Sequence, residues 1–170
     1  MLEFLTILAS HLDELKETSQ ELLEVLNEYQ SFLVEGNLAK IEEITPRIDK
    51  LAGKVKLLDN SRKQLIEEFF ERMGWTGPKN FSSLAKLISS KEISDEEAAA
   101  FERVKRSREE LIKVLAEVDA QNSLNITLIN QAMSFADVSL RMLLGAESGA
   151  ETYGPKGEEN AGPSFLDAQV

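Results

Sequence analysis

Residues 2–34 read LEFLTILASHLDELKETSQELLEVLNEYQSFLV, and this stretch decides the fold class. Apolar side chains recur every three or four residues, and Glu, Asp and Lys are frequent between them. This heptad spacing predicts a long amphipathic helix of the coiled-coil kind, which must pack against other helices. The stripe consists of Leu5, Leu8, Leu12, Leu15, Leu22, Leu26, Tyr29 and Leu33, and only Ser19 interrupts it.

Gly36 and Asn37 follow and predict a helical hairpin. Gly adopts the left-handed conformation that ends many helices, and Asn can cap the helix that begins after it. Pro46 either lies in the first turn of a fresh helix or kinks a continuous one, and the unbroken heptad phase across it favours the kink. We expect Gly74 to end this second helix. Its stripe contains Ile41, Ile44, Ile48, Leu51, Val55, Leu58, Leu65 and Phe69, with a polar Arg62.

Two further helices are predicted after the Gly-rich break that begins at Gly74. Apolar residues at 81, 84, 87 and 88 could line a short helix, and residues 94–97 (Ser-Asp-Glu-Glu) form a capping box. No Pro or Gly occurs between that box and Gly145, which predicts one helix of about fifty residues. The sequence therefore predicts an all-α fold, an antiparallel bundle of three long helices plus one short helix with coiled-coil-like packing. We expect the bundle domain to span 1–144, and 145–170 to form a flexible, acidic, disordered tail.

The charge and composition exclude several classes of function. The 170 residues carry 19 Lys and Arg against 30 Asp and Glu, a formal net charge of -11, and there is no Cys and one His. Such acidity disfavours nucleic acid and anionic membrane surfaces as partners. We therefore expect no nucleic-acid partner, no membrane insertion, no metal and no other cofactor. An acid at position 3, where a signal peptide would carry Lys or Arg, favours a cytoplasmic protein.

No group of residues resembles a catalytic site. His11 lies beside the apolar stripe without a Glu three residues before it, so a half-exposed histidine is the simplest interpretation. Paired acids such as Glu109 and Glu110 fall on charged helix faces, and Trp75 reads as a packing anchor in the loop. We therefore predict that the protein is not an enzyme.

The most informative feature is the charge-poor end of the last long helix. Between Ala120 and Leu144 only Asp137 and Arg141 are charged, whereas the chain-wide share of 29% would place about seven charges among these 25 residues. The helix is also about fifteen residues longer than its neighbours. Either the short helix at 81–88 covers this end as part of the core, or it is a partner-binding surface. Two asparagines at stripe positions, Asn122 and Asn125, are expected to be buried and to fix helix register.

Four segments resemble flagellar export chaperones of the FlgN type. They are Glu35-Gly36-Asn37-Leu38 after the Leu-rich opening helix, Arg62-Lys63-Gln64-Leu65-Ile66 leading to Met73-Gly74, Asn122 and Asn125 with Leu128-Ile129-Asn130 behind them, and Tyr153-Gly154-Pro155-Lys156-Gly157. The resemblance implies a cytoplasmic chaperone that binds hook-associated proteins, which form the hook–filament junction. It would hold their terminal helices and deliver them to the flagellar type III export apparatus.

The resemblance also implies two sites. Cargo would dock on the C-terminal helical region, and Tyr153 with Gly154 would engage an export-gate component. The alternative is a coiled-coil adaptor that acts only through homo-oligomerisation, and the sequence leaves open whether the free protein is a monomer or a swapped homodimer. The residues predicted to bind the substrate protein are Leu128, Ile129, Met133, Phe135, Val138, Met142 and Leu143.

Overall fold

The computed structural model describes residues 1–150, with side chains described through residue 145. It contains α1 (Leu2–Glu35), α2 (Leu38–Arg72), α3 (Phe81–Ser89) and α4 (Asp95–Ala150), and these described residues form no strand. The prediction of an all-α bundle with three long helices and one short one is confirmed. The chain divides into two compact units, Met1–Ile129 and Asn130–Val170. The predicted tail from residue 151 onward lies outside the described residues, and the predicted division after residue 144 stays a prediction.

The hairpin between α1 and α2 forms as the sequence predicts. Gly36 has φ 65°, and its N–H donates to the carbonyl of Leu33 at 3.2 Å, which closes the end of α1. Asn37 then caps α2, because its Oδ1 accepts a hydrogen bond from the N–H of Lys40 at 3.3 Å. Two ion pairs, Lys54–Glu14 and Arg47–Glu28, join the helices in opposite order, since the later residue of α1 pairs with the earlier residue of α2. The two helices are therefore antiparallel.

Pro46 lies inside α2 rather than at the start of a new helix. The helix tolerates it, although proline has no N–H to donate to the preceding turn. Beside it, the Thr45 hydroxyl donates to the carbonyl of Ile41 at 2.6 Å. The interpretation with a continuous helix is correct, and a fresh helix at this point is excluded. At the other end, Gly74 has φ 64° directly after α2, as predicted.

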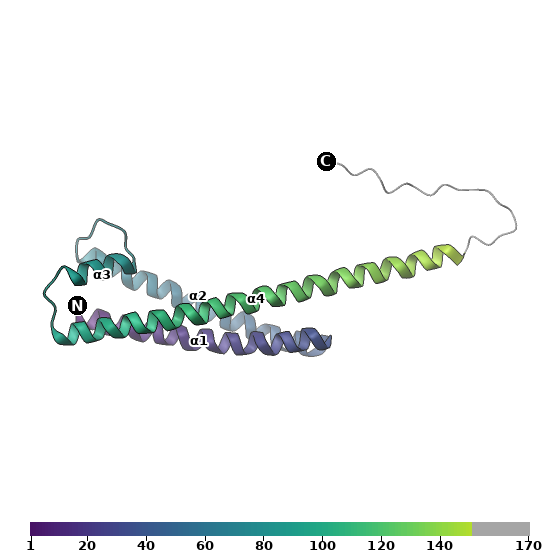
Figure 1. Cartoon of the computed structure of the whole chain (residues 1–170), viewed down its shortest axis with the longest axis horizontal. Coiled ribbons are helices and arrows are strands. Elements are labelled where there is room, and N and C mark those ends of the chain that lie inside the picture. The colour runs from purple at the N-terminus through teal and green to yellow at the C-terminus, as the bar shows by residue number, and fades with distance from the viewer. Residues whose placement is uncertain (151–170) are drawn as a thin grey trace. The chain divides into compact units, whose positions relative to one another are not determined.

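Helix α4 begins with the predicted capping box and runs parallel to α1 in the first unit. Ser94 Oγ accepts from the N–H of Glu97, and Glu97 Oε2 accepts from the N–H of Ser94, both at 3.2 Å. Side-chain contacts then ascend both helices together, from Arg103–Asp13 to Gln121–Gln30. Within Met1–Ile129, α1 and α4 are thus parallel and α2 is antiparallel to both (Figure 1).

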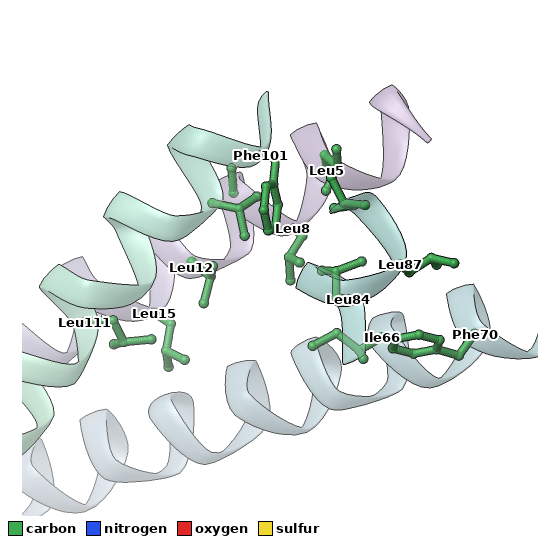
Figure 2. Close-up of a cluster of buried hydrophobic side chains, with 13 residues drawn as sticks. Leu5, Leu8, Leu12, Leu15, Ile66, Phe70, Leu84, Leu87, Phe101 and Leu111 are labelled. Atoms are coloured by element: carbon green, nitrogen blue, oxygen red, sulfur yellow. The ribbon is translucent and has the colours of Figure 1, made fainter. Parts of the chain in front are cut away.

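The core of the first unit gathers side chains from all four helices. Helix α3 contributes Leu84, Leu87 and Ile88, which pack with Phe70 of α2 and Phe101 of α4 (Figure 2). Helix α1 contributes its apolar stripe, and the one polar stripe position is satisfied locally, since buried Ser19 donates to the carbonyl of Leu15 at 2.7 Å. The stripe residues of α1 in this cluster are Leu5, Leu8, Leu12 and Leu15.

The predicted end of the last helix at Gly145 is wrong, because α4 continues through it to Ala150. A single glycine costs a helix about 1 kcal/mol relative to alanine, which weakens a helix without forcing it to stop. Gly36 and Gly74 differ from Gly145 because both adopt a positive φ. No proline follows Gly145 before Pro155, so the sequence contains no stronger signal to end the helix there.

Candidate functional site

The predicted cargo-binding residues of the second unit are exposed apolar side chains. Phe135 is 75% exposed, Met142 70%, and Met133, Leu143 and Val138 between 49% and 67%. Large apolar residues are rarely left in water in such number over one short segment, and such a grouping is typical of interaction surfaces. The two remaining residues of the set, Leu128 and Ile129, belong to the first unit and are half-buried.

Most polar residues in this part of α4 follow one narrow line, from which only Gln131 and Ser139 depart. Asn130, Ser134, Asp137 and Arg141 stand at i, i+4, i+7 and i+11, which places them on one face of the helix. Asp137 and Arg141 pair with each other at 2.9 Å, so the only two charges here largely satisfy one another. Apart from Gln131, the rest of the circumference is apolar or small. The segment therefore offers a partner an apolar surface broader than one ordinary helix face.

Helix α3 does not cover this segment. Its buried side chains pack with residues of α1, α2 and the start of α4, as the core cluster shows (Figure 2). The apolar residues from Met133 to Leu144 keep about half or more of their surface exposed. The alternative in which α3 places the charge-poor end of α4 in a four-helix core is thus wrong. Helix α3 instead closes the end of the bundle where α1 and α4 begin.

Asn125 and Asn122 differ, although both were expected to be buried. Asn125 is 2% exposed, and its Nδ2 donates to the carbonyl of Leu26 in α1 at 3.0 Å. Gln121 supports this contact, since its Nε2 donates to Gln30 Oε1 at 2.8 Å. Asn122 is exposed and lies only about 60° around the helix from Asn125, where it lines the hollow next to Ile48 and Ala52 of α2. Burial of Asn125 is confirmed and burial of Asn122 is wrong.

A second polar contact joins α1 and α4 near their starts. Ser107 Oγ donates to Asp13 Oδ1 at 2.6 Å, and Arg103 Nη2 donates to Asp13 Oδ2 at 2.7 Å. Burial alone would raise the pKa of Asp13, but these two hydrogen bonds outweigh it and hold the pKa below its usual value. One turn further along, a hydrogen bond at 2.8 Å raises the pKa of Lys16 and lowers that of its partner Glu110. Both pairs favour the charged forms that join the two helices.

A furrow in the first unit is a feature that the sequence interpretation missed. It lies between α2 and α4, with α1 as its floor, and we call it the α2–α4 furrow. Two hollows of about 260 and 310 Å³ meet at Leu115 and form it. The α4 side is lined by Arg108, Ile112, Leu115 and Asp119. Their spacing of i, i+4, i+7 and i+11 is the signal in the sequence that could have revealed a second, narrower stripe beside the core stripe.

The remaining predictions concern single residues and absences. His11 is half-buried as expected. Trp75 packs on Phe70 with ring centroids 5.7 Å apart, and its Nε1 donates to the carbonyl of Pro78, so it is a packing anchor as expected.

Among the described residues, no group of three or more His, Asp or Glu could hold a metal ion. None of the helices that the structure describes has a stretch apolar and long enough to span a bilayer. Tyr153 and Gly154 lie outside the described residues.

Comparison with known proteins gives one match. A family model described as FlgN protein matches residues 1–161, which is nearly the whole chain. No curated protein and no solved structure matches at a significant level.

Proposed function

The chain belongs to the FlgN family of flagellar export chaperones, and from this premise we propose that it binds hook-associated proteins in the cytoplasm and delivers them to the export apparatus. The single observation that carries the proposal is the run of exposed apolar residues on α4 between Met133 and Leu144. A chaperone of this kind must hold amphipathic segments of an unassembled protein. An exposed, largely apolar helix is suited to that task because it can pack against the apolar face of a second helix.

The proposed cargo surface consists of the seven residues that the sequence predicted. Phe135, Val138 and Met142 form one side of the α4 segment at i, i+3 and i+7 spacing, and Met133 lies on the other side of the polar line. Methionine adapts its shape to different partners, which suits a chaperone with more than one cargo. Leu143, Leu128 and Ile129 complete the set.

The proposed delivery step uses Tyr153 and Gly154. An aromatic residue that follows α4 in the sequence can contact an export-gate component while α4 holds the cargo, and simultaneous contacts raise the effective local concentration of each partner. The same proposal makes the protein a carrier without catalytic activity, in keeping with its chaperone family.

The second function to consider is an adaptor that acts only by homo-oligomerisation. The same exposed apolar residues favour it, because two copies could cover them mutually. The two functions differ in what covers the exposed residues of α4, which is a cargo protein for the chaperone and a second copy of this chain for the adaptor.

Calorimetric titration of the full chain with a purified hook-associated protein tests the proposal. Phe135→Glu should weaken binding about tenfold or more, because it places a charge within an apolar contact. Ser134→Glu is the matched control, since it introduces the same charge one residue away on the polar line, and it should leave the affinity nearly unchanged. Absence of binding by the wild-type chain, together with a dimer that Phe135→Glu dissociates, would favour the adaptor.

A further inference from the structure

The α2–α4 furrow has the dimensions of a docking site for one helix. On α4 it extends from Arg108 to Asn122, which corresponds to about 21 Å at 1.5 Å per residue and to a helix of about fifteen residues. Its hollow near Arg108, about 260 Å³, exceeds the ~150 Å³ that can hold a benzene ring. It can therefore receive a large apolar side chain as an anchor.

The α4 edge of the furrow carries incompletely covered apolar residues, while the α2 edge near Arg108 carries the mutually paired Asp59 and Arg62. Ile112 is 47% exposed and Leu115 is 38% exposed, and both line the hollows. Leu12 and Leu15 of α1 lie at the floor, and Figure 2 shows them beside Leu111 of α4. A helix laid over Ile112 and Leu115 would remove apolar surface from water at about 25 cal/mol per Å².

Opposite charges stand at the two ends of this apolar strip. Arg108 stacks on the ring of Phe81, with its guanidinium carbon 4.6 Å from the centroid, and it has no carboxylate partner among the described residues. Asp119 lies three turns further along the same face and likewise forms no ion pair there. In a chain with a net charge of -11, an arginine without an acidic partner beside an apolar hollow is a conspicuous binding feature.

We infer that the α2–α4 furrow binds an amphipathic helix of a partner protein, a helix with carboxylates in its first turn and a basic residue in its last turn. The carboxylates pair with Arg108, and the basic residue pairs with Asp119. Helices favour acids at the N-terminus and bases at the C-terminus, so the charge order of the furrow places the bound helix parallel to α4. Its apolar residues, at i, i+4, i+7 and i+11, cover Ile112 and Leu115.

This site is separate from the proposed cargo surface and stands on different observations. All residues that line it belong to Met1–Ile129, whereas the exposed cargo residues belong to the second unit. A second copy of this chain fits the furrow less well. Its exposed α4 segment carries only the mutually paired Asp137 and Arg141, four residues apart, whereas Arg108 and Asp119 are eleven residues apart.

The test is a titration of the full chain with three fluorescently labelled, fifteen-residue peptides. The first has leucines at the spacing above, glutamates in its first turn and a lysine in its last. The second peptide has lysine in its first turn and glutamate in its last turn, and the third has the residues of the first peptide in scrambled order. We expect the first to bind best and to shift the methyl NMR signals of Ile112 and Leu115. Arg108→Glu should weaken the first peptide about tenfold and strengthen the charge-exchanged one.

Two matched controls separate the furrow from general charge and hydrophobicity. Ile112→Glu places a charge inside the furrow and is the second test variant. The control for Arg108→Glu is Lys113→Glu, which makes the same charge change on α4 outside the furrow. The control for Ile112→Glu is Ile126→Glu, at a similar exposure of 50%, and these are the two control variants. Both should leave peptide affinity within about twofold. If Arg108→Glu fails to fold, Asp119→Lys replaces it, because Asp119 is exposed. This variant should weaken the first peptide and strengthen a peptide whose last-turn lysine is exchanged for glutamate.

Several outcomes would overturn the inference. They are equal affinity for all three peptides, equal effects of Arg108→Glu and Lys113→Glu, or methyl shifts confined to the Met133–Leu144 segment. A dimer in sedimentation that Ile112→Glu dissociates would assign the furrow to a second copy instead. None of these results depends on whether hook-associated proteins bind, so this inference and the proposed function can fail separately.

Discussion

The side-chain amide of Asn125 in α4 donates a hydrogen bond to the backbone carbonyl of Leu26 in α1, 99 positions earlier, at 3.0 Å. The donor is 2% exposed, and Gln121 and Gln30 pair beside it. A buried amide among apolar stripe residues is satisfied only at one relative height of two helices. This contact therefore fixes how far α4 is displaced along α1, at the last part of α4 that belongs to the first unit.

Asn125→Ala should lower the free energy of unfolding by about 1–3 kcal/mol, because it removes the donor and opens a small void in a buried site. Urea denaturation followed by circular dichroism measures the loss. Asn122→Ala is the matched control at an exposed position three residues away, and it should stay within about 0.5 kcal/mol of wild type. Equal losses in the two variants would contradict the assigned role of Asn125.

The cap of α4 should be measurable in the same way. Ser94→Ala removes the acceptor for the N–H of Glu97 and should cost about 1 kcal/mol. Ser123→Ala makes the same change at an exposed position inside α4, where alanine is the better helix former, and should not destabilise the protein. A Ser94→Ala variant as stable as wild type would show that the cap contributes nothing to the bundle.

Stability should depend on pH through Asp13. The hydrogen bonds from Ser107 and Arg103 hold its folded-state pKa below the unfolded value of about 3.9, so the carboxylate stabilises the fold above that pH. As the pH falls through the folded-state pKa, the folded carboxyl also becomes protonated and this contribution disappears. We therefore expect Asp13→Asn to be about 1 kcal/mol less stable than wild type at pH 7, and the difference to vanish in strong acid.

The measurement for Asp13 is a series of urea unfolding curves between pH 7 and pH 2. Glu14→Gln serves as the control, because Glu14 is exposed and forms only a long ion pair of 3.7 Å with Lys54. A difference between wild type and Asp13→Asn that persists unchanged at pH 2 would show that it does not arise from ionisation.

The exposed apolar residues of α4 should be nearly neutral for folding. Val138→Glu and Met142→Glu alter side chains that are 49% and 70% exposed, so the free energy of unfolding should change by less than about 0.5 kcal/mol. Leu15→Ala, at a site 2% exposed, should by contrast cost about 2–5 kcal/mol. Thermal unfolding of the three variants compares these effects. Unfolding of the glutamate variants would assign their positions to the core and remove them from the proposed cargo surface.

Tyr153 separates a delivery chaperone from an adaptor. Tyr153→Ala should leave both the stability of the bundle and the affinity for cargo unchanged, and should weaken docking of the chaperone–cargo complex to an export-gate component by about 1–3 kcal/mol. Calorimetry of wild type and variant against that component measures the effect. Phe165→Ala, another aromatic in the same C-terminal region, is the control. Equal affinities for wild type and Tyr153→Ala would remove the tyrosine from the mechanism.

Strong local signals predicted the helices well. Gly36 with Asn37 and the 94–97 capping box depend on contacts within a few residues, and each formed as expected. The heptad stripe of α1 was buried as expected as well, because its regular apolar spacing needs cover from neighbouring helices whatever their exact placement. The prediction that α4 ends at Gly145 was wrong because a glycine of this kind ends a helix where its backbone adopts a positive φ, and the sequence alone does not reveal φ. The prediction for Asn122 was wrong because, although it shares a face with Asn125, α1 and α2 leave a hollow beside it, and the sequence does not show where helices leave such a gap.

The furrow was harder to predict than the core for a related reason. Leu111 and Leu115 are four residues apart on one side of α4, yet Leu111 is buried and Leu115 is 38% exposed. Which side of a stripe is covered depends on the angle between α2 and α4, and this angle depends on packing across the whole bundle. Met133 to Leu144 were easier to recognise, since the absence of charge there is visible without knowledge of any neighbour.

The single polar line of Asn130, Ser134, Asp137 and Arg141 has a consequence for selectivity. A helix with one polar line and a mostly apolar remainder can pack against a partner in several rotations about its own axis, since each of them buries a comparable apolar surface area. Recognition then rests on amphipathic pattern and length rather than on a particular order of side chains, as in other adaptable binders. Such a surface would let one small protein bind cargo proteins of unrelated sequence and release each of them without breaking a sequence-specific hydrogen bond or ion pair.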